Sequence, residues 1–304
     1  MKLHDTQITN YLTFCKSQKC LDVKTIRAYK IDLTHFASTM PAETSLYDIA
    51  SRQIESYIAH LHSIYKPKTA KRKIASLKAF FHYCEFYEFI ERNPFDKIQI
   101  RFREPVILPK TIPLQTLELF LSTIYNQRQL ATTSYQQKNA LRDAAVIELL
   151  FATGIRISEL CSLKSCDVNL NDNFVLIYGK GSKERKLQIG NDNVLKTLNE
   201  YKNTFSKEIE NCGHFFANQS GKPLSDQSVR RMIQKYASLA GIDQHITPHM
   251  FRHTFASSLL DADVDIRYIQ EMLGHSSITT TQIYTHVKKK KQKMILTTKH
   301  PRNG

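Results

Sequence analysis

Apolar residues recur at helical spacing along the first hundred residues of the chain. Three groups share one face of a helix each: Ile8, Leu12 and Cys15; Ile26, Leu33 and Phe36; and Ile54, Ile58 and Leu61. A longer stripe predicts a helix from residue 68 to about residue 90, and Asn93-Pro94 follows it, a pair that disfavours further helix. The pattern predicts a compact helical domain over residues 1–100.

The pattern changes after residue 100. Residues 101–113 hold three prolines and no helical period, which predicts an extended linker. The second domain, residues 114–304, opens with predicted helices at 114–125 and 140–152. A strand at 174–178, a glycine-containing turn and a strand at 183–189 form a predicted hairpin. Helices follow at 191–203 and at 225–240, the latter between Ser225 and Gly241. The expected fold is mainly α with a small antiparallel sheet.

The net charge narrows the class of partner. Lysine and arginine number 43 against 28 acidic residues, which leaves +15 and a pI near 9.5 over 304 residues. Such a surplus favours a polyanion. The sequence holds no apolar run of about 18 residues and no start typical of a signal peptide, so we expect no membrane partner. Six scattered cysteines without a Cys-x-x-Cys pair favour free thiols and a cytoplasmic location.

The predicted helix that starts near residue 68 is unusually basic. Lys68, Lys71, Arg72 and Lys73 lie in a stretch without any acidic residue. Two interpretations remain open: a solvated face, or a face that contacts phosphates, because charge of one sign at this density repels itself without a partner.

Three short motifs in the second domain carry residues suited to phosphoryl transfer. They supply six candidates: Arg156, Lys180, His249, Arg252, His275 and Tyr284. Two guanidinium groups can grip a phosphate through paired hydrogen bonds and stay charged. A lysine and two histidines can donate or move protons. A tyrosine hydroxyl can attack phosphorus.

Several of these assignments have alternatives. Lys180 lies in the hairpin turn, and Lys183, Arg185 and Lys186 follow it, so Lys183 is the next candidate for its role. Glu159, three residues after Arg156, could pair with that arginine and orient it.

The spacing of His249 and His253 would also suit a zinc site. Met250 stands where a metalloprotease would have glutamate, and Arg252 would place a cation beside the metal. We therefore expect no metal site.

The motifs together resemble those of tyrosine recombinases, most closely the bacterial Xer-type enzymes and related integrases. The matching stretches are Ala152-Thr-Gly-Ile-Arg156-Ile-Ser-Glu-Leu, Gly179-Lys180-Gly-Ser-Lys-Glu-Arg, Pro248-His249-Met-Phe-Arg252-His253 and Leu273-Gly-His275 with Tyr284 nine positions later. The resemblance is strongest over residues 140–290.

The resemblance implies a C-shaped clamp of two domains around duplex DNA, with a SAM-like helical N-terminal domain and a recombinase catalytic domain. Tyr284 would form a 3′-phosphotyrosyl bond, and strand exchange would pass through a Holliday junction. Arg156, Arg252 and His275 would hold the phosphate, Lys180 would protonate the leaving oxygen, and His249 would assist at the tyrosine. One phosphate ester replaces another, so neither ATP nor a metal cofactor is expected.

The DNA contacts beyond this centre are expected on three basic surfaces. The helix at 225–240 is a candidate major-groove reader through Gln227, Arg230 and Arg231, although Asp226 beside them repels phosphate. Lys183 and Arg185 would contact DNA from the hairpin, and Lys68, Lys71, Arg72 and Lys73 from the N-terminal domain.

The expected function is site-specific recombination in dimer or multimer resolution, hence in chromosome partition, or in movement of a mobile element. The alternatives are a type IB topoisomerase-like activity and a DNA-binding protein without catalysis. The expected partners are DNA with paired inverted half-sites and further recombinase subunits in a tetramer, with or without a second related recombinase. Residues 288–304 form a basic tail with seven lysines or arginines, which either binds DNA or, through residues 294–296, packs on a neighbouring subunit.

Overall fold

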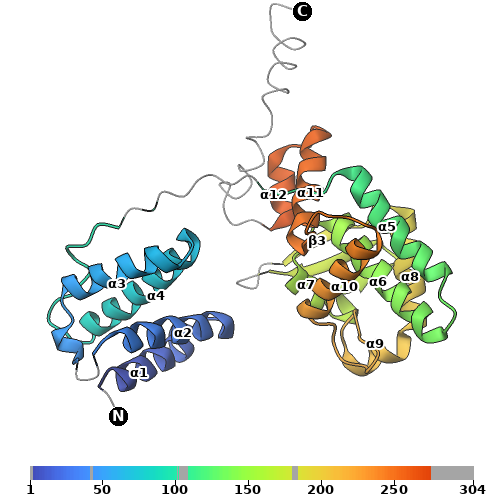
Figure 1. Cartoon of the computed structure of the whole chain (residues 1–304). Helices are drawn as coiled ribbons and strands as arrows, with labels where there is room; N and C mark the ends of the chain where they lie inside the picture. Colours follow the sequence, from blue (N-terminus) through green and yellow to red (C-terminus); the bar gives the residue numbers. More distant parts are fainter. Residues whose placement is uncertain (1–2, 42–43, 101, 103–108, 180–183, 275–304) are drawn as a thin grey trace, which may run out of the picture. The chain divides into compact units, whose positions relative to one another are not determined.

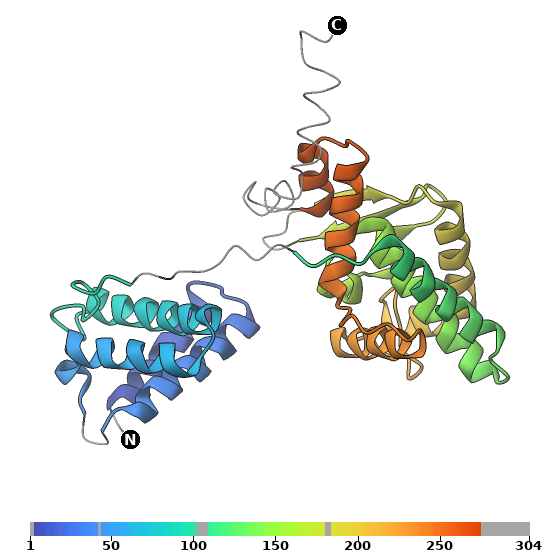
Figure 2. The same ribbon diagram turned by 45° about the horizontal axis from the view of Figure 1, so that its top comes forward.

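The computed structural model describes residues 3–41, 44–100, 102, 109–179 and 184–274. The chain divides into two compact units, Met1–Val106 and Ile107–Gly304. Figures 1 and 2 show their elements from two sides. The described residues are mainly helical, with a small antiparallel sheet in the second unit, which confirms the predicted fold class.

The first unit is built from helices that enclose one core. Its described elements are α1 (Leu3–Ser17), α2 (Val23–Thr39), the 3-10 helix η1 (Leu46–Asp48), α3 (Ser51–Ile64) and α4 (Pro67–Phe86). The three predicted apolar groups face this core together with many aromatic rings. Tyr11 packs edge-on against Phe80 with the ring centroids 5.5 Å apart. Such contacts make α4 the helix on which the others pack, since α1, α2 and α3 each touch it.

A buried carboxylate joins α2 to α4. Asp32 is 1% exposed and accepts hydrogen bonds from Arg72 and from the Ser76 hydroxyl, the latter at 2.8 Å. Lys73 Nζ lies 3.3 Å from the other carboxylate oxygen. A charge taken out of water in this way needs partners of opposite charge, and all three partners come from one turn of α4.

The end of α4 corrects the sequence prediction. The helix stops at Phe86 instead of near residue 90. Glu88 adopts a left-handed conformation with φ of 58°, and the Phe89 N–H donates to the carbonyl of Cys84 at 2.8 Å. This backbone closure ends the helix, so the later proline is not the cause.

The second unit holds a larger set of elements around one buried helix. The described helices are α5 (Leu114–Gln129), α6 (Ser134–Thr153), α7 (Ile157–Ser162), α8 (Asp192–Thr204), α9 (Ser206–Cys212), α10 (Asp226–Leu239), α11 (Pro248–Asp261) and α12 (Ile266–Leu273), with the 3-10 helix η2 (Ser165–Asp167). Residues 143–150 of α6 are all buried, because α5, α7, α8 and α11 pack around it (Figure 2). Most of these residues are apolar, as a helix surrounded by others requires, and the two carboxyl groups among them, Asp143 and Glu148, accept hydrogen bonds from the hydroxyls of Tyr236 and Tyr125.

The beginning of α6 also differs from the prediction. The helix starts at Ser134, six residues before the predicted start at residue 140. Thr133 caps it by accepting from the Gln136 N–H at 3.2 Å, while the Gln136 side chain accepts from the Thr133 N–H. This reciprocal cap supports an exposed, polar first turn without apolar periodicity.

The sheet contains the predicted hairpin and one further short strand. Its order is β1 (Val168–Asn169), β2 (Phe174–Tyr178) and β3 (Glu184–Gln188), all antiparallel. Val175 and Leu187 face each other in the register and are both buried. On β3, Arg185 and Leu187 therefore point inward while Glu184, Lys186 and Gln188 are exposed.

The segment before α5 is tied to the second unit. The Ile112 N–H donates to Thr254 Oγ1 on α11 at 2.8 Å, and Gln244 donates to the Thr111 carbonyl at 3.0 Å. Ile112 is buried in the core of this unit. The last residues of the predicted linker thus pack on the unit that they precede.

Candidate active site

The first candidate arginine is placed by a left-handed glycine. α6 ends at Gly154, whose φ is 60°, and a Cβ there would lie 2.5 Å from the ring of Phe255. Only glycine permits both this conformation and this close approach. The turn leads to Arg156, which immediately precedes α7 as its N-cap residue and whose side chain is 36% exposed.

Glu159 holds Arg156 in two ways. Its Oε2 accepts from the Arg156 backbone N–H at 2.9 Å, and its Oε1 accepts from Arg156 Nη1 at 2.7 Å. The pair expected from the three-residue spacing therefore forms. Because the backbone and the side chain of Arg156 are both held by one carboxylate, the guanidinium has a defined direction.

The same carboxylate binds a second arginine from the sheet. Arg185 on β3 donates from Nη1 to Glu159 Oε1 at 3.1 Å and from Nη2 to Oε2 at 2.6 Å. Its side chain is 9% exposed. The prediction that Arg185 contacts DNA is therefore contradicted, because both terminal nitrogens point at a buried carboxylate.

Arg252 comes from the first turns of α11 and is almost completely buried, at 4% exposure. Its Nη1 donates to the Gly154 carbonyl at 2.8 Å, and its Nη2 donates to the Leu273 carbonyl at 2.5 Å. Arg252 thus connects the turn that carries Arg156 with the end of α12.

Three consecutive carbonyls at the end of α12 receive the three arginines. Arg185 Nε donates to the Met272 carbonyl at 2.8 Å, Arg252 to that of Leu273, and Arg156 Nη2 to that of Gly274 at 3.5 Å. The last carbonyls of a helix lack partners within the helix and carry its negative end, so cations bind there. These three residues immediately precede His275 in the sequence.

Gly274 is needed for this convergence. It ends α12 with φ of 62°, and a Cβ would lie 3.0 Å from Nη1 of Arg185. A larger residue would both strain the turn and displace the guanidinium beneath it.

The electrostatics of the cluster favour an anion. Burial by itself raises the pKa of Glu159, but hydrogen bonds from Arg185 and from the Arg156 backbone outweigh it, so the pKa lies below its usual value. Glu159 is therefore a carboxylate. Three guanidinium groups against this one carboxylate leave an excess of positive charge in the described cluster, which a phosphate could balance.

The two histidines of α11 lie in different surroundings. His249 is exposed in the first turn, while His253 is half-buried. Burial, His249 and Arg252 lower the pKa of His253 to about 4, so His253 is neutral at pH 7. Among the described residues, no group of three histidine, cysteine, aspartate or glutamate side chains is placed to hold a metal.

The remaining predicted residues fall into three groups. Lys180, Lys183, His275 and Tyr284 lie outside the described residues. On α10, Gln227 and Arg231 are exposed and Arg230 is half-buried. On α4, Lys68, Lys71 and Arg72 are exposed, whereas Lys73 is 5% exposed and paired with Asp32. The burial of Lys73 contradicts its assignment to a DNA-contacting face.

Sequence reasoning missed the role of Arg185 and of the α12 carbonyls. The alternation along β3 was a usable signal, since Arg185 shares its face with Leu187 and not with Lys186. For the carbonyls of residues 272–274 no side-chain pattern could serve, because backbone groups are the same in every residue.

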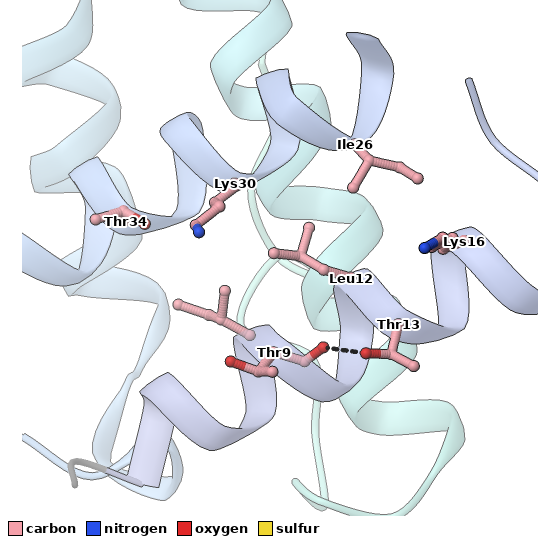
Figure 3. Close-up of a pocket in the computed structure, with 8 residues that line it drawn as sticks. Thr9, Leu12, Thr13, Lys16, Ile26, Lys30 and Thr34 are labelled. Atoms are coloured by element: carbon pink, nitrogen blue, oxygen red, sulfur yellow. Dashed lines mark hydrogen bonds between the residues drawn. The ribbon is translucent and has the colours of Figure 1, made fainter. Parts of the chain in front are cut away.

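A surface groove in the first unit lies between α1 and α2 (Figure 3). Leu12 and Ile26 form its apolar part, and Thr9, Thr13, Lys16 and Lys30 surround them. Thr13 is already bonded to the carbonyl of Thr9 at 3.0 Å. Hydroxyls and lysines alone do not make a catalytic centre, so the arginine cluster of the second unit remains the candidate site.

Of the helices in the described part of the chain, none is long and apolar enough to cross a membrane.

Comparison by sequence finds similar proteins over almost the whole chain. Residues 124–291 match the model of the phage integrase family, and residues 8–85 match that of the phage integrase N-terminal SAM-like domain. A tyrosine recombinase of Agathobacter rectalis is 68% identical over 300 residues, 98% of this chain and 97% of that protein. Tyrosine recombinase XerD of Listeria innocua is 35% identical over 302 residues, 97% and 98% of the two chains.

Solved structures share the fold at lower identity. The XerH site-specific recombinase bound to its difH substrate in a pre-cleavage complex has a TM-score of 0.69 at 24% identity, over 93% of this chain and 81% of that chain. A lambda integrase tetramer bound to a Holliday junction has a TM-score of 0.68 at 18% identity, over 90% and 77%.

Proposed function

Because the chain belongs to the phage integrase family and is a tyrosine-type site-specific DNA recombinase, we propose that Arg156 and Arg252 hold the scissile phosphate. The observation that carries this proposal is their convergence on the adjacent carbonyls of Gly274 and Leu273. Residues far apart in the sequence thereby meet at one place beside the exposed guanidinium of Arg156. Planar, permanently charged groups suit the non-bridging oxygens of a phosphate.

The proposed reaction exchanges one phosphate ester for another. The Tyr284 oxygen attacks the phosphorus, the bond to the 5′-oxygen breaks, and Lys180 gives that oxygen a proton. His249 takes the proton of the tyrosine, and His275 adds a hydrogen bond to the phosphate. The bond number is unchanged, so the freed 5′-hydroxyl of a partner strand can reverse the step without ATP. The cluster's positive charge favours the tyrosine anion, whose ordinary pKa is about 10.

The proposed DNA contacts are narrower than those that the sequence suggested. On the first unit they are the exposed Lys68, Lys71 and Arg72 of α4, and on the second unit Gln227, Arg230 and Arg231 of α10. Lys183 remains a candidate from its position in the sequence. We assign residues 1–100 and 114–304 to the two arms of a DNA clamp and residues 101–113 to the connection between them.

The proposed assembly is a tetramer on two DNA sites that each consist of paired inverted half-sites. The lambda integrase tetramer on a Holliday junction and the XerH complex with difH support this arrangement through their common fold. In the proposal, residues 288–304 dock on the next subunit, and the tetramer forms with or without a second related recombinase. We place the activity in the cytoplasm, in the resolution of DNA dimers or multimers, hence in chromosome partition, or in the movement of a mobile element.

A nicked duplex tests the proposed nucleophile. The substrate carries the inverted repeat that flanks the gene, with a nick that lets the cleaved strand diffuse away and so traps the covalent complex. Tyr284→Phe should abolish the covalent complex, because only the attacking oxygen is lost, while DNA binding measured by gel shift stays unchanged. Tyr268→Phe, an exposed tyrosine on α12, is the matched control and should cleave normally.

Other outcomes of this experiment would contradict the proposal. Covalent product from Tyr284→Phe would assign the nucleophile elsewhere. Equal cleavage of a duplex with a scrambled sequence would favour a topoisomerase-like activity. Binding without any covalent product from the unmodified protein would indicate a DNA-binding protein without catalysis.

A further inference from the structure

Each of the three guanidinium nitrogens of Arg185 donates a hydrogen bond within the protein. Its Nη1 and Nη2 bind the two oxygens of Glu159, and its Nε binds the Met272 carbonyl at 2.8 Å. The side chain is 9% exposed. Arg185 therefore acts on the candidate site through its contacts with Glu159 and with the Met272 carbonyl.

Two features of the fold maintain this position. The alternation of β3 turns Arg185 inward beside Leu187, which is buried. Gly274 leaves space for it, since a Cβ there would lie 3.0 Å from Nη1 and 3.3 Å from Cδ. A position held by strand register and by a glycine opposite is specific to the arginine's shape and not merely to its charge.

The contacts of Glu159 indicate what Arg185 does. Oε1 accepts from both Arg156 Nη1 and Arg185 Nη1, and Oε2 from both the Arg156 N–H and Arg185 Nη2. Without Arg185 the whole charge of the carboxylate would act on Arg156. A carboxylate and a phosphate compete for one guanidinium, so Arg156 would bind the phosphate less strongly.

We propose that Arg185 is a positioning residue for catalysis. It compensates the negative charge of Glu159, so that the Arg156 guanidinium binds the scissile phosphate more strongly. It also fastens β3 to the end of α12 through the Met272 carbonyl. β3 begins one residue after the segment 180–183 that contains Lys180, so the same bond joins the strand of the hairpin to the arginine cluster. This inference rests on the proposed role of Arg156.

The first experiment separates positioning from DNA contact. Arg185→Gln and Lys186→Gln remove the same charge from neighbouring residues of β3, but Lys186 is exposed and lies over the Phe174 ring. We expect Arg185→Gln to slow covalent cleavage at saturating protein by about tenfold to hundredfold, the usual cost of losing a group that orients a ligand. The DNA dissociation constant and its salt dependence should stay within about twofold of the unmodified protein's. Lys186→Gln should cleave at the normal rate.

The second experiment tests the charge itself. If the unpaired carboxylate is what slows Arg185→Gln, then adding Glu159→Gln removes the competitor, and the double variant should cleave faster than Arg185→Gln alone. A purely structural role predicts the opposite, because two broken contacts would then be worse than one. Should Arg185→Gln fail to fold by circular dichroism, Arg185→Met replaces it in both experiments, with Lys186→Met as its control, because methionine has a long unbranched side chain without a charge.

The outcomes distinguish this inference from the proposed function. Arg156→Lys is measured in parallel. If Arg156→Lys cleaves normally, the proposed phosphate clamp fails. If Arg156→Lys is inactive and Arg185→Gln cleaves normally, only the positioning role fails. A weakened, less salt-dependent DNA affinity of Arg185→Gln with a normal saturated rate, or a double variant no faster than Arg185→Gln, also overturns the inference.

Discussion

Each unit of the chain contains a buried carboxylate bound to several basic or polar groups, and the two clusters are built differently. Asp32 is 1% exposed and Glu159 is 7% exposed. The partners of Asp32 are Arg72, Lys73 and Ser76, all from one turn of α4. The partners of Glu159 come from the start of α7 and from β3, and these arginines also reach the end of α12. A local cluster fastens two helices, whereas a cluster drawn from several elements can orient a guanidinium toward a ligand.

The largest expected effect is a loss of folding stability when the Asp32 cluster is broken. Asp32→Asn leaves Lys73, which is 5% exposed, without its opposite charge. Breaking a buried pair at one partner costs about 3–5 kcal/mol of folding stability. Hydrogen exchange measured by mass spectrometry should show lost protection in α2 and α4 but not in α6.

Asp96→Asn is the control for this prediction, because Asp96 is exposed in the same unit. It should leave protection unchanged. If Asp32→Asn slowed cleavage at saturating DNA while protection stayed normal, the assignment of the two clusters to stability and to catalysis would be wrong.

The second-largest expected effect is a loss of cleavage rate when the arginines around Glu159 and the end of α12 are changed. Arg156→Lys and Arg252→Lys keep one positive charge but cannot supply two parallel hydrogen bonds. Each should slow covalent cleavage about a hundredfold, equivalent to about 2.7 kcal/mol in the barrier. Arg267→Lys makes the same exchange at an exposed position of α12 and should cleave normally. Near-normal rates in both cluster variants would remove the phosphate-binding role.

The same comparison explains which parts of the fold were predictable. Apolar spacing located the helices of the first unit because each of them buries one stripe. In the second unit α5, α6, α8 and α10 were predicted near their observed ranges, whereas the short helices α7 and α9 were not. Lys73 was misassigned, although its position shows its burial: it lies three residues after Ala70 and four before Leu77, both buried. The basic residues 68–73 were assigned to one face of the helix, whereas the side chains of consecutive residues point to different sides of a helix. The polar first turn of α6 was missed because its cap, not its apolar pattern, starts the helix.

In the candidate site, the sequence indicated residue types and one local pair. Arg156 precedes α7 and Glu159 is the third residue of that helix, so their contact follows from the geometry of a helix start, where this side chain reaches back to the residue before the helix. The contact of Arg185 with Met272 joins residues that only the folded chain brings together, and its acceptor is a backbone carbonyl. Local periodicity contains no information about such a contact, which is why a residue that looked like a DNA contact is an internal one.

The smallest expected effect concerns a histidine beside each cluster. Burial, Lys73 and His60 lower the pKa of His35, which bonds to the Tyr57 hydroxyl at 2.8 Å. Burial, His249 and Arg252 lower the pKa of His253 to about 4. A histidine whose folded pKa lies below its unfolded value of about 6.5 takes up protons more readily when unfolded, so stability falls as the pH drops from about 6.5 toward the folded pKa.

When the pH falls from 7 to 5.5, we expect His253 to lower the free energy of unfolding by about 1 kcal/mol, because roughly one pH unit of this range lies below the unfolded pKa. Urea unfolding followed by circular dichroism at the two pH values measures it. His253→Gln should flatten this pH dependence, and His35→Gln should flatten it less. Since Arg252 is always charged, acid adds a second cation beside it, whereas His35 has Asp32 nearby, which acts in the opposite direction. Equal flattening by both variants would mean that the charge of Asp32 does not distinguish the two sites, and the contrast between the clusters would then be one of geometry alone.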